Sequence, residues 1–175
     1  MEENAAEAGS DIDWALEEVI SQVATRAKEV GANDPAYTVS VVDGRNARLV
    51  VYRKSSTPDD FDVQKYVALA PAGVSIAFEA AALSATEIEN LSGMITAMSP
   101  EFRAAGIRLH GWGPDYASGM QILYTSDTPE IPRRLLERLE IYGPGTVAFK
   151  PGSIVGLANR QADTSLLCGW SNPRT

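Results

Sequence analysis

Two residue types that catalytic and metal centres often require are scarce in this sequence. Among 175 residues there is one cysteine, Cys168, and one histidine, His110. A disulfide bond within the chain is therefore excluded, and so is a zinc site made of several cysteines and histidines. No apolar run reaches the roughly 18 residues that a membrane-spanning helix needs, so we expect no transmembrane segment.

Basic residues are missing from one end of the chain. Residues 1–25 hold seven acidic side chains and no lysine or arginine, whereas the other 16 acidic and 15 basic residues nearly cancel, and the net charge is −8. The basic surface of a nucleic-acid-binding protein is thus absent. The first residues also lack the basic and apolar regions of a secretion signal. We expect a cytoplasmic location for the chain as written, or secretion if a leader has been removed.

What the sequence does contain is an alternation of amphipathic helices and short strands, with 45% hydrophobic and 22% charged residues, as in ordinary globular proteins. Residues 49–52 are apolar on both faces, which predicts a central strand. Phe61, the stem of Lys65 and Leu69 are expected to line one side of a short helix. The first helix is predicted at 14–31 and the two hairpin strands at 37–42 and 47–53. The short helix is predicted at 57–70 and the last strand at 74–79.

The second half predicts the same order of elements. Ser84 and Glu87 are placed to cap its first helix, and Pro100 is expected to kink or interrupt that helix. The buried stripe of its second helix is expected to contain Ile131, Leu135, Leu139 and Tyr142. The first helix of this half is predicted at 84–106, the hairpin strands at 107–112 and 120–125, the second helix at 128–142 and the last strand at 146–150.

Short motifs of the first half recur in the second. Thr-Pro-Asp at 57–59 recurs as Thr-Pro-Glu at 128–130, 71 residues later. Ile-Ala-Phe, which ends at Phe78, recurs as Val-Ala-Phe, which ends at Phe149, at the same offset. We interpret these matches as an internal duplication of an α-β-β-α-β unit, and two copies are too few for a solenoid.

The predicted fold class is therefore α+β, with two tandem α-β-β-α-β units, ferredoxin-like or pro-domain-like, and a mostly antiparallel sheet. The first strands of the two hairpins match at an offset of 70, Tyr37 with Ile107, which predicts a second hairpin loop one residue longer than the first. The chain is predicted to divide into a flexible acidic N-terminus (1–9), a first unit (10–80), a second unit (84–150) and a C-terminal tail (151–175).

His110 and Cys168 are the one candidate pair of base and nucleophile. His110 is expected on a strand face with Arg108 and Trp112, and no flanking motif supplies a nucleophile within reach. Cys168 lies in the apolar stretch Leu-Leu-Cys-Gly-Trp, where a small buried residue is the usual interpretation. We expect no enzymatic activity, with a cysteine-dependent hydrolase as an alternative.

Acidic and glycine-rich motifs were weighed for metal and cofactor binding. Asp59, Asp60 and Asp62 lack the glycine and distal glutamate of a calcium loop, and acids in the first turn of a helix explain them without a metal. Gly111-x-Gly113 lacks the third glycine of a dinucleotide fingerprint and lies in a hairpin. We expect no cofactor and no metal.

Residues 113–122 (GPDYASGMQI) and 135–143 (LLERLEIYG) resemble the pro-region of actinobacterial trypsin-like serine proteases of the alpha-lytic and streptogrisin type. In that family a hairpin with an Asp and a Ser-Gly turn precedes a helix that ends in Tyr-Gly, followed by a strand. Residues 159–165 (NRQADTS) are similar to the Arg-x-x-Asp segment just before the protease body. The resemblance covers about residues 84–165, without the protease domain.

The resemblance implies a non-catalytic module that binds a protein, a trypsin-like protease, and assists its folding or inhibits it. In that family the C-terminal tail lies in the protease cleft. The partner-binding residues that this implies here are Asn159, Arg160, Asp163, Leu166, Leu167 and Trp170. Two alternatives remain: the tail packs on its own sheet, or the duplicated fold serves a structural or assembly protein such as a virion or surface component. Nucleic acid and membrane are not expected partners.

Overall fold

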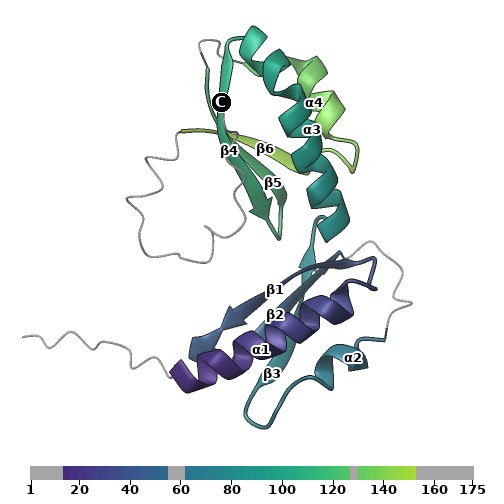
Figure 1. The fold of residues 1–175 in the computed structure, drawn as a ribbon. Helices are drawn as coiled ribbons and strands as arrows, with labels where there is room; N and C mark the ends of the chain where they lie inside the picture. The colour runs from purple at the N-terminus through teal and green to yellow at the C-terminus, as the bar shows by residue number, and fades with distance from the viewer. Residues whose placement is uncertain (1–13, 55–61, 127–129, 153–175) are drawn as a thin grey trace, which may run out of the picture.

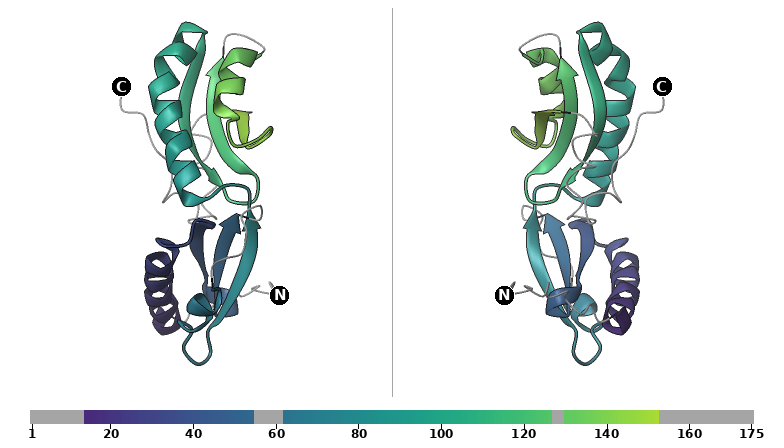
Figure 2. Two further views of the ribbon diagram at one scale, coloured as in Figure 1. Left: turned by 90° about the vertical axis from the view of Figure 1, so that its right-hand side faces the viewer. Right: turned by 90° about the vertical axis from the view of Figure 1, so that its left-hand side faces the viewer.

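The computed structural model describes residues 14–54, 62–126 and 130–152. These residues form two three-stranded sheets, each with helices on one face, and the two units are stacked end to end (Figure 1; Figure 2). The predicted α+β class is confirmed. No helix within the described ranges is both long enough and apolar enough to cross a bilayer.

The first unit has its hairpin in the order that the sequence predicts. Its sheet has the order β1-β2-β3, so the apolar strand β2 is central as expected. Strand β2 pairs antiparallel with β1 and parallel with β3. The elements are α1 (Trp14–Gly31), β1 (Tyr37–Asp43), a 3-10 turn (Gly44–Asn46), β2 (Arg48–Lys54), α2 (Gln64–Val67) and β3 (Ser75–Ala81).

The second unit repeats this arrangement. Its sheet has the order β4-β5-β6, with β4 and β5 antiparallel and β5 and β6 parallel. Both sheets are therefore mixed, with one pairing of each kind, because the chain passes through α2 or α4 before its third strand and returns in the same direction. The elements are α3 (Ala85–Ala104), β4 (Ile107–Asp115), β5 (Gly119–Ser126), α4 (Arg133–Leu139) and β6 (Val147–Pro151).

The strand registers of the two sheets correspond. Leu49 lies opposite Ile76 in the first sheet, and Met120 lies opposite Val147 in the second. Leu49 and Met120 are 71 residues apart in the sequence, and so are Ile76 and Val147. The same spacing separates the repeated sequence motifs. The duplication itself stays a prediction, and the shared register agrees with it.

The hairpins correct one detail of that prediction. Tyr37 lies opposite Arg53, and Leu109 lies opposite Tyr124, so Tyr37 corresponds to Leu109 at an offset of 72 and not to Ile107 at 70. The loop between paired strand ends is four residues in the first hairpin (44–47) and three in the second (116–118). The second loop is therefore one residue shorter, and the prediction of a longer one is wrong.

The core of the first unit lies between α1, α2 and the sheet. Gly31 ends α1 as predicted, and a Cβ at this position would lie 2.5 Å from the Tyr37 ring. The side predicted for the short helix is correct for Leu69, which packs half-buried on this core, and wrong for Lys65, which is exposed while Tyr66 is buried. Phe61 lies outside the described residues. The buried residues are Ile20, Val23, Ala27, Tyr37, Leu49, Val51, Tyr66 and Val74.

The core of the second unit agrees closely with its predicted stripe. Leu135 and Leu139 of α4 are buried, and Ile131 and Tyr142 pack half-buried against the same cluster. The helix face that meets them consists of Leu91, Ile95, Met98 and Phe102.

The start of α3 confirms one prediction, and its interior contradicts another. Ser84 and Glu87 form the expected capping box. Helix α3 continues through Pro100 without interruption. A proline removes one backbone hydrogen bond, and here both Pro100 and Thr96, whose carbonyl loses its donor, are exposed, so that water can solvate the freed carbonyl.

Residues 82–84 link the two units, and each of them takes part in a hydrogen bond. The Ala82 N–H donates to the Tyr116 carbonyl at 3.1 Å, and the Thr38 hydroxyl donates to the Leu83 carbonyl at 2.6 Å. Ser84 caps α3. Residues 82–84 therefore join β1 of the first unit to the β4–β5 turn of the second.

Two side-chain contacts reinforce this junction. The Tyr116 ring, from the β4–β5 turn, lies 5.3 Å from the Tyr52 ring of β2, measured between centroids. Lys54 at the end of β2 forms an ion pair of 2.5 Å with Glu87, the capping-box residue of α3, and both side chains are largely buried. The same glutamate thus caps a helix of one unit and binds a strand of the other.

The close approach at Gly119 yields a first prediction. Gly119 has a φ of +118°, and a Cβ there would lie 2.2 Å from the Thr146 carbonyl oxygen. We expect Gly119→Ala to lower the free energy of unfolding by about 2–4 kcal/mol, measured by urea denaturation. Gly93→Ala is the control, since Gly93 lies in α3 with open space around it, and it should gain about 0.5–1 kcal/mol. Equal effects of the two substitutions would contradict this account of Gly119.

Candidate functional site

The predicted partner-binding residues lie outside the part of the chain that the structure describes. Asn159, Arg160, Asp163, Leu166, Leu167 and Trp170 all fall within 153–175, as does Cys168. Their roles stay predictions, and so does the pairing of Cys168 with His110. The described residues instead provide the surface next to this segment, because β6 ends at Pro151.

His110 lies at an irregularity of β4 and has a partner. The register between β4 and β5 shifts between Leu109 and Gly111, which marks His110 as an extra residue, a β-bulge. Its Nε2 lies 2.8 Å from the Thr125 hydroxyl. The predicted shared face with Trp112 is wrong: beyond the bulge the alternation is reversed, and Trp112 is buried in the helix-side core.

The described member of the predicted acidic cluster has a backbone role. The Asp62 carboxylate accepts a hydrogen bond of 2.9 Å from the Gln64 N–H at the start of α2, as expected for an acid at a helix start. Asp59 and Asp60 lie outside the described residues. Within the described ranges no group of three or more Asp, Glu, His or Cys side chains is placed to hold a metal ion.

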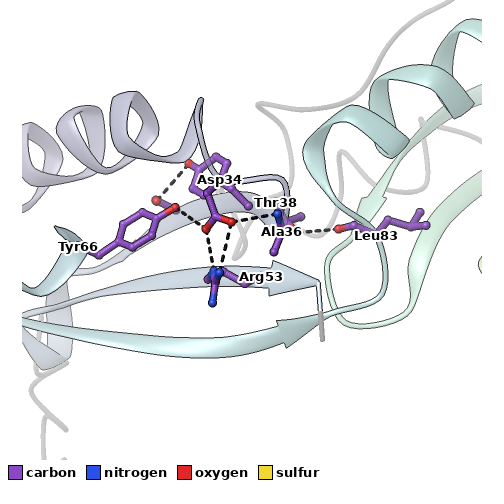
Figure 3. A network of polar contacts seen from close by, with 8 residues as sticks. Asp34, Ala36, Thr38, Arg53, Tyr66 and Leu83 are labelled. Carbon is purple, nitrogen blue, oxygen red and sulfur yellow. Dashed lines mark hydrogen bonds and ion pairs between the residues drawn. The ribbon is translucent and has the colours of Figure 1, made fainter. Parts of the chain in front are cut away.

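A buried carboxylate that sequence reasoning missed organises the first unit (Figure 3). The Asp34 side chain is 0% exposed and forms an ion pair of 2.7 Å with Arg53 Nε. It also accepts hydrogen bonds from Arg53 Nη2 at 3.3 Å, the Ala36 N–H at 3.0 Å and the Tyr66 hydroxyl at 2.9 Å. Asp34 therefore joins the α1–β1 turn to β2 and α2.

These contacts set the ionisation of the pair Asp34 and Tyr66. Burial by itself raises the pKa of Asp34, but the hydrogen bonds from Arg53, Ala36 and Tyr66 and the Arg53 charge outweigh it, so the pKa lies below 3.8. Burial, together with the hydrogen bond and charge of Asp34, raises the pKa of Tyr66 far above its ordinary value. The carboxylate is ionised and the phenol is neutral at physiological pH.

The geometry of this network accounts for a structural role. Four donor groups occupy the two Asp34 oxygens, which leaves little capacity to accept a substrate proton. A hollow of about 410 Å³ beside it is walled by both units, with Lys28 and Asn33 on one side and Thr86 and Glu89 of α3 on the other. Its charged lining residues are Lys28, Glu89 and Asp34. Because the Asp34 charge is already paired with Arg53, the remaining two charges are of opposite sign and give no marked preference for a charged ligand.

Each sheet has a helix-free face, which we define as the face opposite its helices. In the first sheet, alternation from the core residues Leu49 and Val51 places Val41, Val50 and Ala77 in one row across this face. In the second sheet, the helix-free face contains Gly111, Gly113, Gln121, Leu123, Ala148 and Lys150.

The four sheet edges differ in how they are protected. Strand β1 is irregular at Thr38 and β4 at His110, and bulges hinder the addition of another strand. Strand β6 ends in Lys150-Pro151, which protects only its last part. Strand β3 has no bulge, lysine or proline.

The Asp34 network yields a second prediction. We expect Asp34→Asn to lower the free energy of unfolding by about 3 kcal/mol at pH 7, because it removes the buried carboxylate charge that pairs with Arg53. The pKa of Asp34 is lowered on folding, so its contribution is present above pH 3.8 and is lost as the pH falls through the folded value. The difference between wild type and variant in urea denaturation should therefore shrink from pH 6 to pH 2.

Asp43→Asn is the matched control, because the Asp43–Arg48 pair is partly exposed, at 23% and 39% of the side chains. We expect it to cost under about 1 kcal/mol. A difference for Asp34→Asn that stays constant over the pH range would contradict the assigned charge of the carboxylate.

Comparison of the chain with protein-family models, with curated proteins and with solved structures gave no match in any of the three.

Proposed function

We propose that this chain is a non-catalytic protein-binding module of the pro-domain type, which binds a trypsin-like serine protease. The surface that we assign to this role is the helix-free face of the second sheet, the free edge of β6 and the tail that follows. The observation that carries the proposal is that β6 has a strand partner on one side only among the described residues, and that the predicted partner-binding segment follows it in the sequence.

The backbone of β6 supports the addition of a partner strand. The Gly152 N–H donates to the Tyr124 carbonyl at 2.9 Å, so the alternate residues Val147 and Phe149 direct their backbone groups away from β5. These groups match the backbone of an extended partner segment. Lys150 and Pro151 then end the usable edge, where the tail begins.

The helix-free face of the second sheet supports contact with a partner beyond its edge. Leu123 is an apolar side chain on this face and is 7% exposed. Its cross-strand neighbours are Gly111, which has no side chain, and Lys150. Leu123 is therefore already buried within the chain, and the side chains that this face offers to a partner are those of Gln121 and Lys150, which are half-buried and exposed.

The class of partner that we propose comes from the resemblance to protease pro-regions. Strand addition at β6 would place residues 153–175 against the same partner, as the tail of that family lies in the protease cleft. The carried-over residues Asn159, Arg160 and Asp163 supply polar contacts, and Leu166, Leu167 and Trp170 supply apolar area. Two linked contacts of this kind reinforce each other through a high effective concentration.

Inhibition of a streptogrisin-type protease tests this function. We expect the full chain to inhibit the protease, and a chain ending at residue 152 to bind about a hundredfold more weakly, because one of two linked contacts is removed. Removal of residues 1–13 is the matched control and should leave the inhibition constant unchanged. A full chain that neither inhibits such proteases nor raises their refolding yield would overturn the proposal.

The edge of β3 favours a second candidate function, assembly with a further copy of this chain. Phe78 on β3 and Val67 on α2 are 39% and 44% exposed. The Ser75 N–H donates to the Ala47 carbonyl, so by alternation the Ala80 N–H points away from β2. Two β3 strands can pair antiparallel about Phe78 without opposing like charges.

Light scattering distinguishes the two candidates. Assembly predicts dimers at high concentration, and Ala80→Pro should abolish them, because it removes an outward N–H and leaves the bonds to β2 intact. Val19→Glu on α1, at the same 39% exposure as Phe78, should not affect them. A monomer at all concentrations would exclude assembly through β3.

A further inference from the structure

Two arginines share a small hollow at one end of the second sheet. The hollow has a volume of about 170 Å³ and is lined by Arg103, Gly106, Ile107, Arg108 and Thr125. Arg103 comes from the last turn of α3, Arg108 from the start of β4 and Thr125 from the end of β5. Arg108 and Thr125 lie opposite each other on neighbouring strands. Three elements thus converge on this position.

The charge in the hollow has no counterpart. Neither Arg103 nor Arg108 has a carboxylate partner within the described ranges, whereas Arg48, Arg53, Arg133 and Arg138 each form an ion pair. Two guanidinium groups at one hollow repel each other. Arg26, Arg45 and Arg134 also form no ion pair within the described ranges, but Arg103 and Arg108 line the same hollow, where one bound anion would balance both charges.

The end of α3 does not account for both arginines. A basic residue in a last turn is often explained by the helix dipole, and Arg103 is in that position. The last carbonyls, however, already accept backbone hydrogen bonds: the Ala105 N–H reaches Glu101 and Phe102, and the Gly106 N–H reaches Arg103. Arg108 lies on a strand, where no helix dipole explains its charge.

Thr125 adds a neutral donor to the two cations. Its hydroxyl lies 2.8 Å from His110 Nε2. When Nε2 carries the ring proton, it donates to the hydroxyl oxygen, and the hydroxyl proton is then available to another acceptor. The bulge at His110 therefore supports a threonine that can donate into the hollow.

We propose that Arg103, Arg108 and Thr125 form a binding site for a small oxyanion, that is, a phosphate, sulfate or carboxylate group. Guanidinium groups bind such groups through paired N–H donors, and the threonine hydroxyl supplies a further hydrogen bond. The hollow, of about 170 Å³, has room for one such group, either free or carried by a larger ligand. By alternation Arg108 and Thr125 lie at one end of the helix-free face, on β4 and β5 and away from the edge of β6, and the tests of this site use no protease.

The single histidine makes the site measurable by NMR. Because His110 is the only histidine, a protein without a histidine tag gives one set of imidazole resonances. We expect inorganic phosphate to shift these resonances saturably at fixed pH and constant ionic strength, with chloride as the background anion. A shift that only follows ionic strength would overturn the proposal.

Variants test which side chains bind the anion. Arg103→Gln and Arg108→Gln should each weaken phosphate binding by about tenfold or more, as the loss of a charged hydrogen bond predicts. Arg134→Gln is the matched control, because Arg134 on α4 is also exposed and has no carboxylate partner among the described residues, and it should leave binding unchanged. Equal weakening in all three variants would mean bulk charge and not a site. The arginines are exposed, so folding should persist, which circular dichroism checks.

The source of the oxyanion is resolved by comparing ligands on the wild-type chain. Tighter binding of N-acetyl-phosphoserine amide than of inorganic phosphate would identify a group carried by a protein. Binding of inorganic phosphate or sulfate that is as tight or tighter would identify a free ion. Preference for acetate over both would identify a carboxylate. Absence of saturable binding by every one of these ligands would exclude the site.

Discussion

One extra residue in the first strand of each hairpin decides which side chains each sheet presents. Side chains alternate between the faces of a strand, so a displacement of one residue exchanges core and surface. In β4 the bulge at His110 lets Ile107, Leu109 and Trp112 all face the core. In β1 the corresponding irregularity at Thr38 places Tyr37 in the core while the threonine reaches Leu83. The cores, the junction and the anion site all depend on these two irregularities.

Local pattern was sufficient to predict most of the elements. The apolar stretch at 49–52 identified β2 as the central strand, and Ser84 with Glu87 identified the start of α3. The motif spacing of 71 residues agrees with the strand registers of both sheets. The predictions of β2 and of the start of α3 succeeded because each rests on residues close together in the sequence, where periodicity and capping chemistry act, whereas the duplication stays a prediction.

The failures involve interactions between distant residues. Asn33-Asp34-Pro35 reads as an ordinary turn, and nothing near it indicates that the partners of Asp34 lie 19 and 32 residues away, at Arg53 and Tyr66. For the same reason the burial of Tyr66 on α2 was missed, since Tyr66 is buried to reach Asp34. The anion site was also invisible in the sequence, because the bulge and the end of α3 together bring Arg103 and Arg108 to one hollow.

The linker at 82–84 has a consequence for the motion of the molecule. The Ala82 N–H, the Leu83 carbonyl and the Ser84 side chain are all hydrogen-bonded, and the Leu83 side chain is buried. A bend between the units must break at least one of these contacts or the Lys54–Glu87 pair. These contacts oppose independent motion of the two sheets, so a partner that binds the second sheet also restrains the orientation of the first.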